Sequence, residues 1–127
     1  MTDLIAVTAW IDGYRRAWNS NDAADIGMLF TVDAEYFTAP YREPARGRQA
    51  VVDQWLLHKD EPGETTFEWR PVVIASELAV VEATTRYPGQ TYSNLWLITL
   101  DADGQCRRFV EWWMEQPTET SSSGVPT

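Results

Sequence analysis

Apolar side chains near the start of the chain recur at the spacing of one helical stripe. They follow one another at intervals of three, four, three and four residues, so they fall on the same side of an amphipathic helix. We therefore predict a helix over residues 3–19. The members of this stripe are Leu4, Val7, Ile11, Tyr14 and Trp18.

A polar segment at residues 19–22 ends this helix and begins a second one. Asp22, followed three residues later by Asp25, resembles a capping box in which aspartate replaces the usual glutamate. We predict a short helix up to about Phe30 and then a short strand over residues 35–39.

Residues 40–47 contain two prolines and a glycine. These residues exclude regular structure, so we predict a loop there. A third helix is predicted over residues 48–58. Its apolar side carries Val51, Val52, Trp55 and Leu56.

From residue 65 onward the apolar pattern changes to a period of two, which is typical of half-buried strands. Turn signals at residues 76–77, 88–89 and 101–104 divide this region. The result is a four-stranded antiparallel meander that follows the helices. Helices gathered on one side of such a sheet form an α+β domain. The predicted strands cover residues 65–75, 78–87, 91–101 and 105–115.

Alternation along the last strand places a single carboxylate, Glu111, between two large aromatic residues. Phe109, Trp113 and Arg107 are expected on the same face as Glu111. Tight turns at residues 88–89 and 103–104 fix which residues of neighbouring strands are paired, although a one-residue bulge would change the face locally. The expected pairs are Trp96 with Glu111, Ile98 with Phe109, and Ala83 with Asn94.

The more aromatic face of this sheet is expected to pack against the helices. The opposite face is also largely apolar, and a sheet that is apolar on both faces needs cover on both. We therefore predict a homodimer through this outer face, which carries Leu95, Leu97, Val110 and Trp112.

Length and composition fit one globular domain over residues 1–116, with a disordered tail over residues 117–127. Of the 127 residues, 44% are apolar, and the net charge is −9, which argues against nucleic acid or an anionic membrane as a partner. The single cysteine, Cys106, cannot form an internal disulfide. The N-terminus lacks a basic region followed by a long apolar run. We expect a cytoplasmic protein.

The candidate catalytic residues are Glu111 and Tyr14. Glu111 would act as a general acid or base if it lies among aromatic residues, whereas an ion pair with Arg107 or another arginine would make it structural. Tyr14 lies on the inward stripe of the first helix, where its hydroxyl could position a ligand or pack in the core. The candidate ligand-binding residues are Trp18, Trp55, Asn94, Trp96, Phe109 and Trp113.

The charged side chains outside this group are weaker candidates for a functional site. His58, the only histidine, falls at the end of the third helix, where a cation suits the helix dipole. One histidine and one cysteine cannot form a His/Cys metal cluster. Arg42, Arg46 and Arg48 could form an anion clamp or remain solvated. No phosphate-binding loop or dinucleotide motif is present, and we expect no cofactor.

The order of these elements and their motifs resembles the nuclear transport factor 2-like superfamily, in its SnoaL-like branch. The resemblance extends from Trp10 to about Pro117. It implies a curved, mainly antiparallel sheet wrapped around three helices as a cone, with a pocket at the open end and dimers commonly formed through the outer sheet face. The motifs that carry it lie at residues 14–18, 29–36, 40–47, 103–106 and 109–113.

The superfamily includes isomerases, cyclases, epoxide hydrolases and binding modules, so the resemblance leaves the activity open. Members that isomerise ketosteroids carry a base aspartate before a proline at the end of the first strand, where this chain has Ala39 before Pro40. Polyketide cyclases tend to carry histidine or aspartate on the final strands, where this chain has Phe109 and Glu111.

Three hypotheses follow. The first is a domain that binds a small, mostly apolar organic molecule and acts on it without a cofactor, with Glu111 as acid or base. The second is a ligand-binding domain without catalysis. The third is a dimerisation module whose cone is filled by its own tryptophans.

Overall fold

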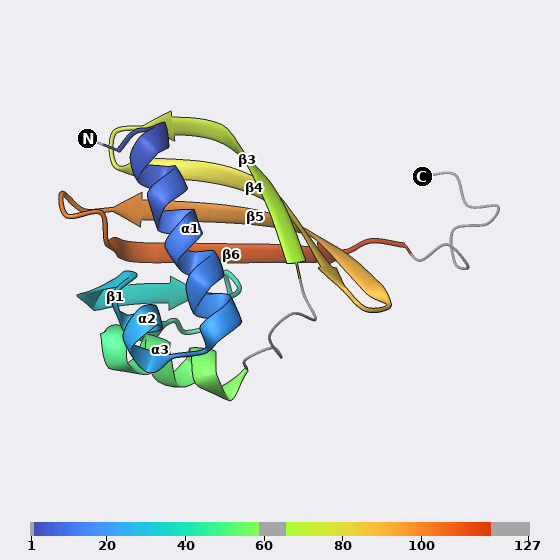
Figure 1. Cartoon of the computed structure of the whole chain (residues 1–127), viewed down its shortest axis with the longest axis horizontal. Helices are drawn as coiled ribbons and strands as arrows, with labels where there is room; N and C mark the ends of the chain where they lie inside the picture. Colours follow the sequence, from blue (N-terminus) through green and yellow to red (C-terminus); the bar gives the residue numbers. More distant parts are fainter. Residues whose placement is uncertain (1, 59–65, 118–127) are drawn as a thin grey trace.

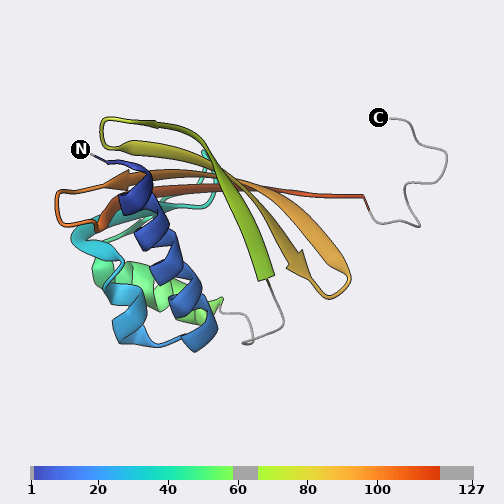
Figure 2. The ribbon, with the colours of Figure 1, turned by 45° about the horizontal axis from the view of Figure 1, so that its top comes forward.

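The computed structural model describes residues 2–58 and 66–117 of the chain. Three helices lie on one side of a six-stranded sheet, as Figures 1 and 2 show. The strand order is β2-β1-β6-β5-β4-β3, and every neighbouring pair is antiparallel except β1 with β6. The elements are α1 (Leu4–Ser20), α2 (Ala23–Gly27), β1 (Phe30–Phe37), β2 (Ala45–Arg46), α3 (Arg48–Leu57), β3 (Thr66–Ala75), β4 (Leu78–Tyr87), β5 (Gln90–Leu100) and β6 (Cys106–Glu115).

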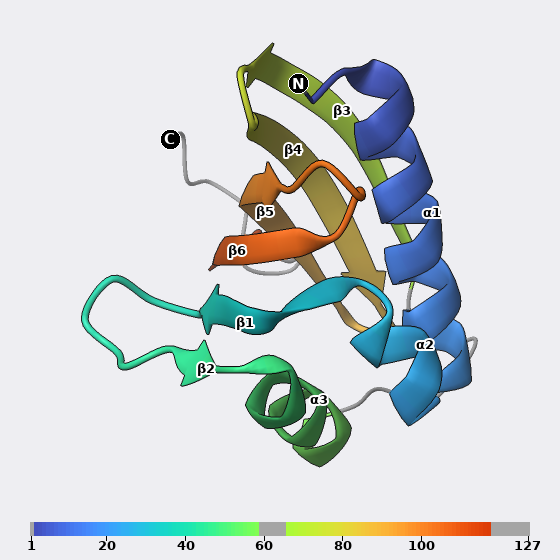
Figure 3. The ribbon, with the colours of Figure 1, turned by 90° about the vertical axis from the view of Figure 1, so that its left-hand side faces the viewer.

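The α+β architecture predicted from the sequence is confirmed. Helix α1 begins where the Asp3 side chain accepts a hydrogen bond from the Ala6 amide at 2.9 Å, and it ends at Asn21, which adopts a left-handed conformation. The predicted stripe faces the sheet along much of its length, and Figure 3 shows the sheet bending around α1. The buried residues of the helix are Val7, Trp10, Ile11, Tyr14 and Ala17.

The prediction of a capping box at the start of α2 is only half right. Asp22 caps the helix, because its carboxylate accepts hydrogen bonds from the amides of Ala24 and Asp25. The Asp25 side chain does not return the bond to the Asp22 amide. It accepts a hydrogen bond from the Ser20 hydroxyl, and the same hydroxyl oxygen accepts from the Asp22 amide. The side chain of Asp25, which is shorter than the glutamate of the usual capping box, is thus hydrogen-bonded to Ser20.

The first strand is longer than predicted. β1 begins at Phe30, where the sequence pattern predicts the end of a helix, and it runs to Phe37. Parallel pairing with β6 explains this difference, because Phe30 is paired with Cys106, whose amide donates to the Leu29 carbonyl at 2.7 Å. Sequence periodicity carries no information about such a distant partner.

The predicted strand pairs of the meander are all present. Trp96 is paired with Glu111, Ile98 with Phe109, and Ala83 with Asn94. As expected, Ala83, Trp96 and Phe109 are buried on the helix side of the sheet.

The expected position of Arg107 is wrong. Thr99 is paired with Arg108 and Leu100 with Cys106, so Arg107 forms a bulge at the start of β6. The bulge allows both Cys106 and Phe109 to be buried, while Arg107 is exposed and forms an ion pair with Glu77. Arg107 therefore does not share the inner face with Glu111.

The outer face of the sheet retains exposed apolar side chains. Trp112 is 47% exposed, and Leu95, Leu97 and Val110 are half-buried. Within residues 2–58 and 66–117, no helix is both long and apolar enough to cross a membrane. Nearly all of the predicted tail over residues 117–127 lies outside the described residues.

Candidate functional site

A cavity of about 600 Å³ opens on the concave side of the sheet, between α1, α3 and the inward-facing strands. This volume lies within the range of small-molecule sites. Its lining combines aromatic side chains with a similar number of polar ones. The lining residues are Tyr14, Trp18, Tyr36, Thr38, Arg42, Val51, Gln54, Trp55, His58, Thr85, Tyr87, Gln90, Tyr92, Asn94, Trp96, Glu111 and Trp113.

The polar centre of this cavity is formed by Glu111 and Tyr36. The Tyr36 hydroxyl donates a hydrogen bond to Glu111 Oε2 over 3.4 Å. Burial, the neighbouring Glu111 carboxylate and Tyr14 together raise the pKa of Tyr36 well above the usual value of 10.0. Tyr36 therefore remains a neutral donor, and Glu111 is an acceptor held in a defined orientation.

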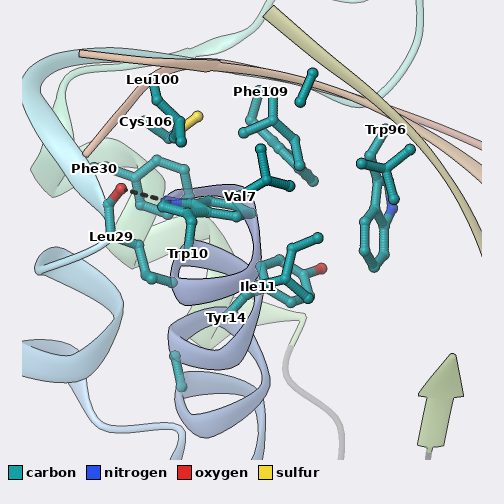
Figure 4. Close-up of a cluster of buried hydrophobic side chains, with 14 of the residues drawn as sticks. Val7, Trp10, Ile11, Tyr14, Leu29, Phe30, Trp96, Leu100, Cys106 and Phe109 are labelled. Atoms are coloured by element: carbon teal, nitrogen blue, oxygen red, sulfur yellow. Dashed lines mark hydrogen bonds between the residues drawn. The ribbon is translucent and has the colours of Figure 1, made fainter. Parts of the chain in front are cut away.

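Tyr14 joins this centre to the core. Its side chain forms a hydrogen bond with Tyr36, and only 7% of the residue is exposed. Its ring contacts the rings of Trp55 and Trp96 at centroid distances of 5.2 and 5.3 Å. Figure 4 shows Tyr14 on α1, below Phe109 and Trp96 of the sheet. Tyr14 is thus both a packing residue and a polar group of the cavity wall.

Thr85 on β4 and Asn94 on β5 form a second polar part of the cavity wall. The Thr85 hydroxyl donates to Asn94 Oδ1 at 2.6 Å, which fixes the Asn94 side chain. Trp96, the next inward residue of β5, is 1% exposed and also lines the cavity.

The predicted aromatic residues divide between cavity and core. Trp18, Trp55 and Trp113 line the cavity, as do Asn94 and Trp96. Phe109 is fully buried and does not line it. Its ring packs on Tyr36 at a centroid distance of 4.9 Å, so Phe109 supports the site from within the core.

The charged residues considered in the sequence analysis are dispersed. Arg42 and the exposed His58 reach the cavity rim. Arg46 binds Glu35 and Glu43, and Arg48 donates to the Phe30 carbonyl at 2.9 Å. The three arginines therefore do not form one anion clamp.

Sequence reasoning missed Tyr36 and Thr85 as site residues. Tyr36 belongs to the predicted first strand, but its proximity to Glu111 depends on the parallel pairing of β1 with β6. Thr85 could have been found from the predicted hairpin, because its position two residues after Ala83 places it on the same inner face.

Metal binding and thiol chemistry find less support in the described part of the chain. Residues 2–58 and 66–117 contain no group of three or more His, Cys, Asp or Glu side chains able to hold a metal ion. Cys106 is fully buried, and this burial raises the pKa of its thiol to about 12. Cys106 is therefore a core residue with little thiolate character.

Comparison with solved structures places this fold among cystatin-like, nuclear transport factor 2-like proteins. An NTF-2 like protein of unknown function from Burkholderia xenovorans LB400 has a TM-score of 0.70 at 15% identity, over 96% of this chain and 94% of the other. A steroid delta-isomerase from Pseudomonas aeruginosa has a TM-score of 0.62 at 16% identity, over 91% and 82% of the two chains.

An LEH-like epoxide hydrolase from M. tuberculosis is also similar, with a TM-score of 0.58 at 12% identity over 87% of this chain and 84% of the other. Identities this low establish a common fold and leave activity open. A sequence comparison with curated proteins gave no match.

The sequence itself identifies the family. The model of the SnoaL-like domain matches residues 11–113, which include every helix and strand from the middle of α1 to β6. The chain therefore belongs to the SnoaL-like domain family, as the sequence motifs predict.

Proposed function

We propose that this protein binds a small, mostly apolar organic molecule in the concave cavity and exchanges a proton with it through Glu111. The observation that carries this proposal is the hydrogen bond between Tyr36 and Glu111 inside the cavity. A carboxylate that is held in place beside a bound molecule can act as a general base, and in its protonated form as a general acid.

The surroundings of Glu111 support this role. Tyr36 orients the carboxylate, and Tyr14 extends the hydrogen-bonded group toward α1. The aromatic walls formed by Trp18, Trp55 and Trp113 suit an apolar ligand. Proton transfer of this kind could serve an isomerisation, cyclisation, hydration or hydrolysis, and none of these requires an added cofactor in principle.

Ligand binding can be tested by filling the cavity from α3. Gln54 lines the cavity, whereas Gln49 on the same helix is outside it. Native mass spectrometry of protein purified from its own host should detect a retained small molecule in the wild type and in Gln49→Trp. The molecule should be lost in Gln54→Trp. Retention by all three proteins would refute binding in this cavity.

A ligand-binding domain without catalysis is the second candidate. The observation that favours it is the same hydrogen bond, because Tyr36 already satisfies part of the acceptor capacity of Glu111 and could make this residue structural. The two candidates differ in the effect of Glu111→Gln. Binding with no turnover in either protein would support the carrier, whereas turnover that this substitution abolishes would support the enzyme.

We further propose that the protein forms a homodimer through the outer face of the sheet. The exposed indole of Trp112 and the half-buried Leu95, Leu97 and Val110 support this assembly, because contiguous apolar surface commonly marks an interface.

A further inference from the structure

Glu111 is the one acidic side chain among the described residues that line the cavity. It is half-buried, so a molecule in the cavity can reach its carboxylate. The Tyr36 hydroxyl donates to Oε2 over 3.4 Å, and an ionised carboxylate has about four acceptor sites in total. Because such a group accepts hydrogen bonds and donates none, the ligand group that meets Glu111 is a donor.

Aromatic rings flank this carboxylate. Trp113 follows Glu111 by two positions on the inner face of β6, a separation of about 7 Å along the strand, and 45% of it is exposed. The Tyr36 ring comes from the neighbouring strand β1, and Trp18 and Trp55 line the helical wall of the cavity. Ring faces attract cations that lie within about 6 Å of the ring centroid. A cation beside Glu111 is therefore stabilised by aromatic rings as well as by the carboxylate.

The positively charged lining groups lie at the mouth of the cavity. Arg42 and His58 line the rim, and both are exposed to solvent, where water and salt screen their charges. The net charge of the chain, −9, adds a field that attracts cations. An anion in the cavity would be repelled by Glu111. A neutral donor gains a hydrogen bond alone, whereas a cationic donor gains a charge-assisted hydrogen bond and the attraction of the rings.

We propose that the cavity selects organic ammonium ions, which are protonated amines on an apolar skeleton, and that their N–H groups donate hydrogen bonds to the Glu111 carboxylate. The ammonium nitrogen lies between Glu111 and Trp113, and the apolar skeleton extends toward Trp18 and Trp55. This inference rests on the proposed function and adds the charge of the ligand and the position of its polar group.

Three probes of nearly the same shape test this proposal. Naphthylmethylammonium is positively charged, naphthylmethanol is neutral and naphthoate is negatively charged, and all three are substituted at the same ring position. Each is titrated into the protein at neutral pH, and binding is followed by calorimetry. The ammonium ion should bind about tenfold more tightly than the alcohol, and naphthoate should bind more weakly than the alcohol. Any other order of affinities, or binding of none of the three probes, would overturn the proposal.

A matched pair of variants locates the charge that the ligand recognises. Glu111→Gln removes the negative charge and keeps an oxygen that can accept from Tyr36, so the preference for the ammonium ion over the alcohol should fall from about tenfold to about twofold or less. Glu115→Gln removes the same charge from an exposed position of β6 outside the cavity and should leave this preference unchanged. A preference that survives in Glu111→Gln, or that is lost equally in both variants, would overturn the proposal.

Gln54→Trp, which fills the cavity from α3, separates this inference from the proposed function. If the substitution does not affect binding of the ammonium ion and the alcohol, the cavity is not the ligand site and both proposals fail. If it blocks binding, but the wild type binds the ammonium ion and the alcohol equally well, only the selection of ammonium ions is refuted.

Discussion

The hydroxyl of Tyr36 on β1 donates a hydrogen bond to the carboxylate of Glu111 on β6, and these are the two strands that run parallel. The contact joins residues 75 positions apart in the sequence. It lies inside a cavity whose walls combine aromatic and polar side chains. The predictions about function depend on this pair.

Tyr36→Phe should preserve the fold and weaken the site. The substitution removes the hydroxyl group that orients Glu111, so any turnover should fall by about tenfold or more, and the free energy of unfolding should fall by about 1 kcal/mol. Urea denaturation and activity are measured together. Tyr41→Phe is the control, because Tyr41 is 82% exposed and does not line the cavity. Equal activity in the two variants would show that Tyr36 does not position Glu111.

Alkaline pH should destabilise the protein partly through Tyr36. The pKa of Tyr36 is raised in the folded state above the usual value of 10.0, so the folded protein holds this proton more tightly than the unfolded chain. The associated stability is complete below about pH 10 and declines as the pH rises toward the folded-state pKa, by up to about 1.4 kcal/mol per pH unit. Urea denaturation above pH 10 should show a shallower decline in Tyr36→Phe. If the free energy of unfolding falls equally steeply with pH in the wild type and in Tyr36→Phe, the prediction is contradicted.

Cys106 should behave as an unreactive core thiol. Burial raises its pKa from 9.0 to about 12, so its contribution to stability is complete below pH 9.0 and is lost as the pH rises toward about 12. A thiol reagent should modify Cys106 at a rate limited by opening of the fold and should react rapidly in urea. Rapid modification of the native protein would show that the thiol is accessible.

Trp10→Phe should reduce stability by about 1–3 kcal/mol. The substitution removes a buried hydrogen bond of 2.9 Å and part of a large core side chain. The loss is limited because the Leu29 carbonyl keeps a second donor, the Cys106 amide at 2.7 Å. Tyr41→Phe, at a residue that is 82% exposed, should change stability by about 0.5 kcal/mol or less. Similar losses of unfolding free energy in both variants would show that the hydrogen bond and packing of Trp10 contribute little to stability.

The outer face of the sheet can be tested through oligomeric state. Light scattering coupled to gel filtration should show a dimer for the wild type and a monomer for Trp112→Glu, because a buried charge without a partner opposes association. Met28→Glu is the control. Met28 is the residue that follows the C-terminal end of α2, and it is 72% exposed. A monomeric wild type would refute the interface.

Much of this fold could be predicted from the sequence because the signals are local. The stripe from Val7 to Tyr14 predicts α1, and short turns fix the hairpin pairs, so the pairing of Trp96 with Glu111 follows from the spacing of residues along the chain. The turn chemistry around Gly104, which has a φ of +81°, ends β5 and begins β6 in the expected place.

The remaining features depend on distant contacts. The bulge at Arg107 follows from burial of both Cys106 and Phe109, which alternation cannot anticipate. The position of Tyr36 beside Glu111 requires the parallel pairing of β1 with β6. The unpaired indole N–H of Trp96 depends on which side chains surround it, and these come from several elements of the fold. These three features define the difference between the predicted and the observed site.

The most direct test of the account is the effect of Glu111→Gln on proton transfer. Wild-type protein is incubated in deuterium oxide with a panel of ketones, lactones and epoxides, and deuterium incorporation and conversion are followed by NMR. Glu115→Gln on the same strand is the control, because Glu115 is exposed and does not line the cavity. We expect turnover of at least one compound, reduced by about a hundredfold or more in Glu111→Gln and by less than about twofold in the control. Turnover that survives in Glu111→Gln would contradict the assignment of Glu111 as the proton-transfer group.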